Sequence, residues 1–197
     1  MSIILTIPTI IQTPRLYMRP AKIGEGVMLH EAIRESFQEL TKWMAWAKEM
    51  TPVEQQELYV RKAQQSWLIK DSDLPLLLFE RKSERFLGGT GFNEIKWDVP
   101  RCAIGYWLRT DATKFGYATE AANALTRYAF EVLDMARVEI RCDAKNIKSH
   151  AVAQRLGFEQ EGVLKKAMRR NDGSLADLIM YARYTCDDLP ELSVIWE

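Results

Sequence analysis

Segments typical of strands and of helices alternate along this chain, and their order limits the folds open to it. Apolar residues at helical spacing predict helices over residues 24–37, 52–70 and 117–132, and a capped segment predicts another over 147–156. Short apolar runs predict strands over 15–22, 74–80, 85–95, 101–108 and 136–143, then a strand pair broken at 171–173. The order β-α-α-β-β-β-α-β-α-β-β favours an α+β fold.

Several local signals mark where these elements begin and end. Thr51, Pro52 and Glu54 supply a cap residue, a proline for the first helical position and an acid three residues after the cap, which predicts a helix start. Asn146 can cap the last helix, and Gly157 suits the left-handed position that ends it. The Trp-rich segment 40–50 is not assigned, and residues 1–11 are expected to form an extended lead-in strand.

Size and charge exclude several classes of protein. A length of 197 residues predicts one domain over residues 1–197, because domains usually contain about 100–200 residues. Lys plus Arg and Asp plus Glu both number 27, so the chain has no net charge to attract nucleic acid, and we expect no direct nucleic-acid partner. No run approaches the roughly 20 apolar residues that span a bilayer, so we expect no membrane insertion.

Cysteine and histidine usage suggests neither a disulfide framework nor a metal site. Cys102, Cys142 and Cys186 lie some forty residues apart, without a CxxC motif, and His30 and His150 are isolated. We therefore expect no metal, and reduced thiols suit a cytoplasmic location.

The stretch AIGYWLRTDATKFGYATEA, residues 103–121, predicts a strand that passes through a polar loop into a helix whose first turn contains Gly116 and Ala118. The first turn of a helix leaves main-chain N–H groups unpaired, and small residues let an anion approach them, so a phosphate or pyrophosphate fits there. The plainer interpretation is a glycine that only starts a helix. Neither GxxxxGK[ST] nor GxGxxG is present.

A second stretch, NIKSHAVAQRLGF, covers residues 146–158. Asn146 and Ser149 are three apart, so both can face one side at the start of a helix. Asn146 could either belong to a site or only cap the helix. Ser149 could either belong to a site or only be exposed to solvent in the first turn. His150 is expected on the surface.

With TPRLYMRP, LTKWMAWA, FLGGTGFNEI and ADLIMYARY, these stretches make nearly the whole chain resemble the GNAT superfamily of N-acetyltransferases, in its RimJ/RimL-like branch. The resemblance implies a mixed, mostly antiparallel sheet of six to seven strands, splayed between the fourth and fifth, with about four flanking helices. It also implies an acetyl-CoA site. The family's pyrophosphate loop falls on residues 113–118, where Thr113 replaces the usual Gln or Arg and Lys114 stands where Gly is common. The implied cofactor-binding residues are Tyr106, Trp107, Leu108, Lys114, Phe115, Gly116, Tyr117, Ala118, Thr119, Asn146 and Ser149.

The resemblance further implies direct attack of an amine on the thioester in a ternary complex. Ser149 would then supply a proton or hydrogen bond to the departing thiolate, and Asn146 would fix the geometry. Main-chain N–H groups around residues 105–107 would stabilise the oxyanion. The residues expected to contact the acceptor are Trp43, Trp46, Asn93 and Glu94.

Other assignments stay open. Glu94 and Asp98 are candidate general bases, and the alternative is that they are only exposed charges of a hairpin. For Trp43 and Trp46, the alternative to acceptor contact is core packing. Asp177 is expected to make a structural hydrogen bond. The acceptor expected first is the N-terminal amine of a ribosomal or other protein. The alternatives are a small-molecule amine, such as a polyamine, amino acid or antibiotic, and a non-catalytic CoA-binding regulator. The apolar N-terminus also suits a homodimer.

Overall fold

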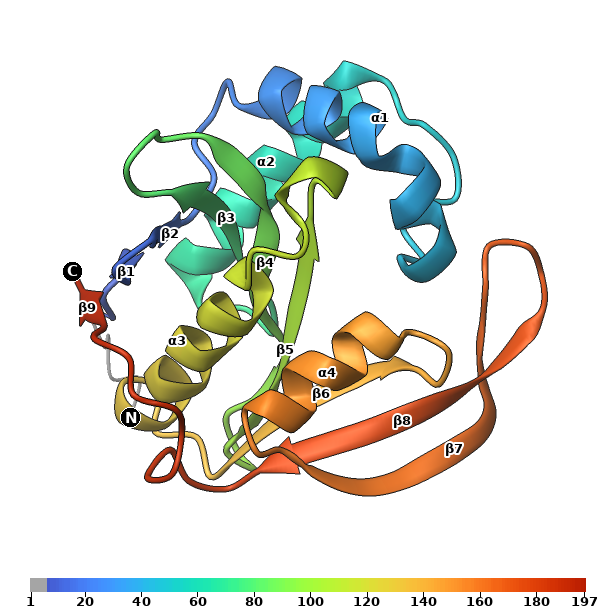
Figure 1. Ribbon diagram of the computed structural model, residues 1–197. Helices are drawn as coiled ribbons and strands as arrows, with labels where there is room; N and C mark the ends of the chain where they lie inside the picture. Colours follow the sequence, from blue (N-terminus) through green and yellow to red (C-terminus); the bar gives the residue numbers. More distant parts are fainter. Residues whose placement is uncertain (1–6) are drawn as a thin grey trace.

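The computed structural model describes residues 7–197, whose strands form a nine-stranded mixed sheet (Figure 1). The order across the sheet is β7-β8-β6-β5-β4-β3-β2-β1-β9, and every pair is antiparallel except β5–β6. The strands are β1 (Ile11–Gln12), β2 (Leu16–Arg19), β3 (Leu74–Glu80), β4 (Phe86–Lys96), β5 (Arg101–Leu108), β6 (Arg137–Asp143), β7 (Glu159–Arg169), β8 (Leu175–Arg183) and β9 (Ile195–Trp196). The helices are α1 (Gly26–Trp43), α2 (Val53–Ile69), α3 (Tyr117–Glu131) and α4 (Ile147–Arg155), with a 3-10 turn, η1 (Thr110–Ala112).

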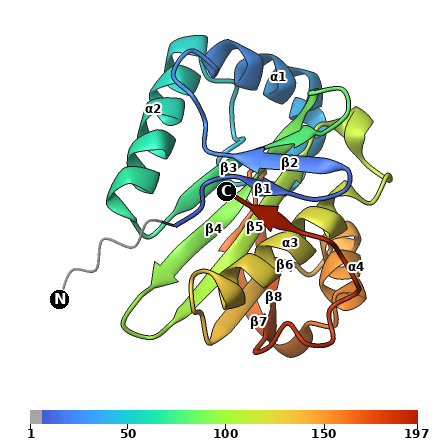
Figure 2. The ribbon, with the colours of Figure 1, turned by 90° about the vertical axis from the view of Figure 1, so that its left-hand side faces the viewer.

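Side chains point alternately to the two faces along each strand and form an apolar core on each face of the sheet. On β3, Leu76 and Leu78 belong to the cluster under α3 and α4, whereas Leu77 and Phe79 belong to the cluster under α1 and α2. Because strand side chains alternate between faces, a run that is apolar on both faces is the pattern of a covered strand. Figure 2 shows the two helix pairs on opposite sides of the sheet.

The predicted fold class is confirmed, and the additional strands lie near the chain ends. Two-residue strands β1 and β9, which pair with each other, raise the strand count above the expected six to seven. Of the predicted lead-in strand over 1–11, residues 1–6 lie outside the described part of the chain. Among residues 7–11 only Ile11 is in a strand, so the prediction for 7–10 was wrong.

Both N-terminal helices differ from their predicted bounds. Helix α1 continues beyond 37 to Trp43, because Ser36 and Leu40 extend the buried stripe begun by Leu29 and Ile33. Helix α2 starts one residue later than predicted: Pro52 is its N-cap and no side chain caps it. The Thr51 hydroxyl instead accepts a hydrogen bond from Gln56 Nε2 at 2.5 Å.

The sheet splays between β5 and β6, which are the fourth and fifth of the predicted strands, as the resemblance implied. These strands pair only at Arg101↔Arg137, Cys102↔Val138 and Ala103↔Glu139, after which they separate. The rest of β5 remains paired with β4 as far as Gly88↔Leu108, so one edge of residues 104–108 is open. Between residues 7 and 197, no helix is long and apolar enough to span a membrane.

Candidate functional site

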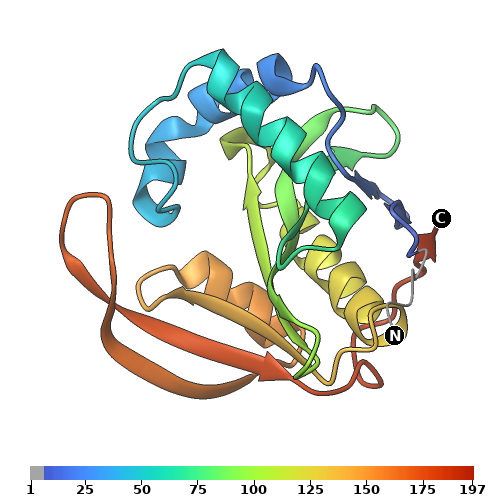
Figure 3. The ribbon, with the colours of Figure 1, turned by 180° about the vertical axis from the view of Figure 1, so that it is seen from behind.

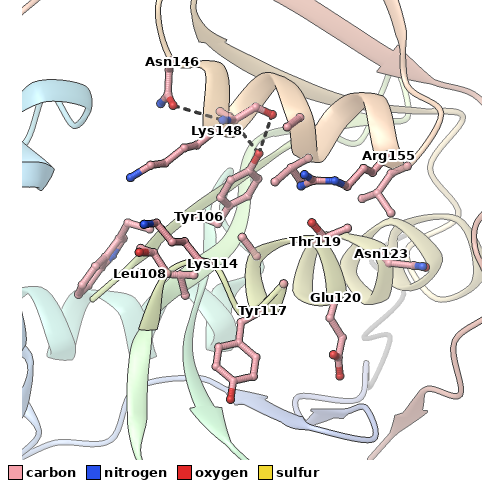
Figure 4. A pocket seen from close by; sticks show the side chains of 18 of the residues that line it. Tyr106, Leu108, Lys114, Tyr117, Thr119, Glu120, Asn123, Asn146, Lys148 and Arg155 are labelled. Atoms are coloured by element: carbon pink, nitrogen blue, oxygen red, sulfur yellow. Dashed lines mark hydrogen bonds between the residues drawn. The ribbon is translucent and has the colours of Figure 1, made fainter. Parts of the chain in front are cut away.

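A cleft of about 970 Å³ opens where β5 and β6 separate. Its walls come from the end of α1, the open edge of β5, the start of α3 and the length of α4 (Figure 4). The lining residues are Arg15, Glu39, Leu40, Trp43, Met44, Tyr106, Trp107, Leu108, Thr113, Lys114, Gly116, Tyr117, Ala118, Thr119, Glu120, Asn123, Asn146, Ile147, Lys148, Ser149, Ala151, Val152, Arg155, Leu156, Pro190 and Leu192.

The start of α3 gives one part of the cleft the properties of an anion site. Gly116 is the N-cap with φ +82°, a left-handed conformation that favours glycine, and no side chain caps the helix. The N–H groups of Tyr117, Ala118 and Thr119 therefore have no partner within the helix, and the positive end of the helix dipole adds to their attraction for an anion.

Arg15, which the sequence analysis did not single out, braces this loop. Its Nη1 donates to the Phe115 carbonyl at 2.9 Å, its Nε donates to Glu120 Oε2 at 2.6 Å, and its guanidinium lies 5.0 Å from the centre of the Tyr117 ring. The Thr13 hydroxyl also donates to Glu120, at 2.5 Å. The loop is thus tied to the turn between β1 and β2 before any ligand binds.

The charges that line the cleft are mainly positive. Arg15, Lys114, Lys148 and Arg155 contribute cations, while the two lining carboxylates, Glu39 and Glu120, are already paired with Lys42 and Arg15. The hydrogen bond from Lys42 lowers the pKa of Glu39. Lys148 and Arg155 are seven residues apart and so share a helix face. This spacing in the sequence could have identified them as cations on the same side of the helix as the cleft.

Two hydroxyls meet in the middle of the cleft. Tyr106 points from β5 toward the start of α4, and its hydroxyl oxygen lies 2.9 Å from Ser149 Oγ (Figure 4). Burial raises the pKa of Tyr106 well above its usual value, so this hydroxyl remains protonated. Asn146 Oδ1 caps α4 by accepting from the Ser149 main-chain N–H at 3.2 Å. The sequence suggested Tyr106 only as part of a strand edge, without a role for its side chain.

His150 lies behind Ser149 and is half-buried, which corrects its predicted surface position. Its Nε2 is 3.1 Å from the Asp143 main-chain oxygen and therefore carries the proton, so Nδ1 accepts from the Tyr181 hydroxyl, also at 3.1 Å. This assignment of the ring proton follows from the hydrogen bonds. His150 thus fastens the first turn of α4 to β6 and β8.

Four predicted site residues do not line the cleft. Trp46 is 50% exposed and packs edge-on against Trp107, with ring centres 5.8 Å apart. Phe115 is 61% exposed, with its ring centre 5.8 Å from that of Tyr117 and its carbonyl accepting from Arg15. Asn93 and Glu94 lie exposed on β4, outside the cleft, and Glu94 is paired with Arg141 at 2.9 Å.

The two remaining candidates, Asp98 and Asp177, lie outside the cleft. Asp98 is exposed in the turn between β4 and β5. Asp177 accepts hydrogen bonds from the Lys166 main chain and the Lys165 ammonium, both at 2.9 Å, which agrees with its expected structural bond. Within residues 7–197, no three His, Cys, Asp or Glu side chains gather in a way that could hold a metal ion.

The family model of the GNAT acetyltransferase domain matches residues 15–159. A probable N-acetyltransferase of Bacillus subtilis, YjcK, is 28% identical over 160 residues, covering 79% of this chain and 87% of the relative.

Two solved structures are similar over most of the chain. One is RimL, a ribosomal L7/L12 α-N-protein acetyltransferase in complex with coenzyme A, with a TM-score of 0.82 and 29% identity over 91% of this chain and 99% of that one. The other is MccE, a microcin C7 self-immunity acetyltransferase in complex with acetyl-CoA and AMP, with a TM-score of 0.79 and 26% identity over 87% of this chain and 93% of that one.

Proposed function

Because the chain belongs to the GNAT family of acetyltransferases, we propose that it transfers the acetyl group of acetyl-CoA to the N-terminal α-amine of a protein or peptide. The chain is an N-acetyltransferase, and acetyl-CoA is its acetyl donor. A ribosomal-protein acceptor is supported by the RimL neighbour, which acts on ribosomal L7/L12.

One observation carries this proposal: a single cleft joins the uncapped start of α3 to the Tyr106–Ser149 hydroxyl pair along the open edge of β5. In our proposal the N–H groups of residues 117–119 bind the diphosphate of acetyl-CoA, with Arg15 and Lys114 adding positive charge. Thr113, in place of the family's Gln or Arg, costs little because most of this binding comes from the main chain.

The pantetheine arm would pair with the free edge of Tyr106, Trp107 and Leu108, which offers main-chain donors and acceptors as a sheet edge does. This placement brings the thioester toward Ser149. Asn146 holds Ser149 in position by capping the helix that carries it.

Proton transfer follows from the hydroxyl pair. The amine attacks the thioester carbonyl, the C–N bond forms, and the C–S bond breaks. Ser149 gives its proton to the departing sulfur, and the proton that the amine loses returns to Ser149 through water, so that no group of the protein stays ionised. Tyr106, which burial keeps protonated, donates a hydrogen bond to Ser149 Oγ as that proton leaves. Among the described residues the two carboxylates of the cleft are both paired, so we assign removal of the amine's proton to water.

The choice of an α-amine as acceptor rests on how readily each kind of amine loses its proton. An α-amine has a pKa of about 8 and a lysine about 10.4, and the difference corresponds to roughly 3 kcal/mol in the availability of the neutral amine at fixed pH. The chain offers no described free carboxylate in the cleft to offset that cost for lysine, so the α-amine is favoured.

A small-molecule acceptor is the second candidate. It is supported by the MccE neighbour, a self-immunity acetyltransferase bound to acetyl-CoA and AMP, whose sequence is about as similar as that of RimL. We also propose that residues 1–197 form one domain, that the protein is cytoplasmic and that it forms a homodimer. Size-exclusion chromatography would test the homodimer.

Thiol release from acetyl-CoA tests the two candidates against each other. The purified chain is incubated with acetyl-CoA and either peptides that begin with Ser or Ala, spermidine, or an aminoacyl nucleotide. Release that depends on the peptides supports the proposal, whereas release with only the small molecules would replace it by the second candidate.

A further inference from the structure

The last part of the chain crosses α3 on its way back to β1, and we call residues 184–194 the C-terminal segment. It follows β8 and leads into β9, whose pairing with β1 fixes its far end. Figures 1 and 3 both show it running beside α3. The family model matches residues 15–159, so this segment lies outside the part of the chain that the model describes.

Two side chains of α3 hold the middle of the C-terminal segment. Asn123 Nδ2 donates to the Pro190 carbonyl at 2.8 Å, and Arg127 Nη2 donates to the same carbonyl at 3.2 Å. Arg127 Nε also donates to Asn123 Oδ1 at 3.0 Å, and Asn123 is only 4% exposed. Residues four apart lie on one face of a helix, so the two side chains act together. The position of Pro190 against α3 is therefore fixed before any ligand binds.

The start of the C-terminal segment is tied to the end of α4. Arg183 Nε donates to the Thr185 carbonyl at 2.7 Å, its Nη1 donates to the Leu156 carbonyl, and its guanidinium pairs with Asp188. Leu189 is buried in the core under α3. Because the segment is held at both ends and in the middle, its exposed side chains form a fixed wall.

This wall and the end of α4 line one end of the cleft. Pro190 and Leu192 supply apolar surface there, and Arg155 supplies a guanidinium. Figure 4 shows the Arg155 side chain pointing from α4 into the cleft, on the side where Thr119 and Asn123 lie. In the part of the chain that the structure describes, Arg155 is exposed and has no hydrogen-bond or ion-pair partner. An apolar surface beside such a cation suits a flat heterocycle that carries a phosphate.

Coenzyme A has a group of this kind at the end away from its thiol. Its diphosphate joins the pantetheine arm to an adenosine whose ribose carries a 3′-phosphate. With the pantetheine arm along the edge of β5, the adenosine leaves the diphosphate toward the rest of the cleft. Asn123 is four residues after Thr119, which is about 6 Å farther along α3. A nucleoside attached to a diphosphate at residues 117–119 therefore reaches the wall.

We propose that the C-terminal segment and the end of α4 form a nucleotide subsite, in which Pro190 and Leu192 pack on the adenine of the coenzyme and Arg155 binds its 3′-phosphate. A guanidinium suits this role because it donates two parallel hydrogen bonds to a phosphate. The chain therefore distinguishes coenzyme A from 3′-dephospho-coenzyme A, which lacks that phosphate. The proposal rests on the proposed function, since the diphosphate must lie at the start of α3.

Direct binding of the two coenzymes to the purified chain tests the role of Arg155 without any turnover. Arg155→Gln removes the charge and keeps an exposed polar side chain. Lys148→Gln is the matched control, because it removes one cation of the same cleft from the other end of α4. Calorimetric titration at low salt measures the Kd of each coenzyme, since salt screens exposed charges.

The wild-type chain should bind coenzyme A about tenfold more tightly than 3′-dephospho-coenzyme A, as a charge-assisted contact with phosphate predicts. In Arg155→Gln the two affinities should agree within about twofold, through weaker binding of coenzyme A alone. In Lys148→Gln the ratio should stay within about twofold of the wild-type value. Added salt should reduce the wild-type ratio.

A second variant tests the apolar wall. Leu192→Asn should weaken binding of both coenzymes by about fivefold, because both carry adenine, and should leave binding of 4′-phosphopantetheine unchanged. Ile195→Asn is its control, since Ile195 is also half exposed and follows the same segment but does not line the cleft. Thermal unfolding checks that each variant is folded.

The inference is overturned if the wild-type chain binds both coenzymes equally, or if Lys148→Gln lowers the ratio as much as Arg155→Gln. Unchanged coenzyme binding in Leu192→Asn would overturn the role of the C-terminal segment. In each of these cases the proposed function stands, provided that Gly116→Val still weakens coenzyme binding. If the wild-type chain binds neither coenzyme, the proposed function fails and this inference falls with it.

Discussion

The Tyr106 and Ser149 hydroxyls come from different walls of the cleft, β5 and α4, and are 2.9 Å apart. Ser149 was predicted from its spacing to Asn146 within a family resemblance, whereas the Tyr106 side chain was not. Nothing in the sequence shows that a residue 43 positions earlier turns its hydroxyl toward Ser149, because that meeting depends on the splay of the sheet.

We predict that Ser149→Ala lowers kcat by about 10²-fold while the Kd for acetyl-CoA changes little, because a general acid typically contributes about 10²–10⁴-fold. Tyr106→Phe should lower kcat less, since Ser149 keeps its own proton. Steady-state kinetics and calorimetric titration measure both. Tyr184→Phe, which removes an exposed hydroxyl bonded to Glu161 outside the cleft, is the control. Unchanged turnover in Ser149→Ala would remove this residue from the mechanism.

Gly116→Val should weaken acetyl-CoA binding by at least about tenfold, because a branched side chain resists φ +82° and crowds the amides of α3. Gly24→Val is the control: its φ is +97°, a side chain there has free space, and the site is not in the cleft. Titration of both variants with coenzyme A separates lost binding from general strain. Equal affinity in the two variants would mean that the diphosphate does not lie at this loop.

The helices and strands could largely be predicted from local patterns, and β3 and β5 have the predicted bounds. What failed depends on distant contacts. Strands β1 and β9 exist because the two ends of the chain pair, and no periodicity in two residues predicts that. The placement of Asn93 and Glu94 away from the cleft follows from how whole elements are arranged.

Helix α4 both positions Ser149 and depends on Asn146 as its cap. Asn146→Ala should cost about 1 kcal/mol of stability, a drop in Tm of about 3 °C, because the Ser149 N–H loses its side-chain acceptor and keeps only the main-chain carbonyl of residue 146. Asn146→Asp should keep the cap and the Tm, since aspartate caps as well as asparagine, yet weaken binding of the anionic coenzyme. Thermal unfolding and coenzyme titration of the pair distinguish capping from ligand contact, and a lowered Tm in Asn146→Asp would contradict the capping role.

The molecule has no net charge, yet its charges are unevenly placed. The cleft gathers cations, while buried carboxylates elsewhere are held by arginines: Asp143 by Arg170, and Glu139 by Arg137 and Arg141. Burial acts to raise the pKa of Asp143, but the bonds from Arg170 and the Lys145 main chain outweigh it, and the pKa is lowered. The pKa of Glu139 is lowered in the same way.

A lowered pKa in the folded state means that the ionised group stabilises the fold above the unfolded pKa, about 4, and that this stability is lost as pH falls further. We therefore predict a constant Tm from about pH 7 to 5 as far as these groups are concerned, and a steep fall below about pH 4. Asp143→Asn should lower the Tm at pH 7 and flatten the acid limb. Differential scanning calorimetry across this range checks it, and an unaltered acid limb in Asp143→Asn would show that this pair does not govern acid unfolding.

The central claim is that the amides at the start of α3 hold a diphosphate and thereby direct a thioester to Ser149. A crystal structure of the chain with coenzyme A tests it most directly. The account predicts phosphate oxygens within hydrogen-bond distance of the N–H groups of residues 117–119, with the coenzyme sulfur beside Ser149 and Tyr106. A coenzyme bound elsewhere on the molecule, or one whose sulfur points away from this hydroxyl pair, would contradict it.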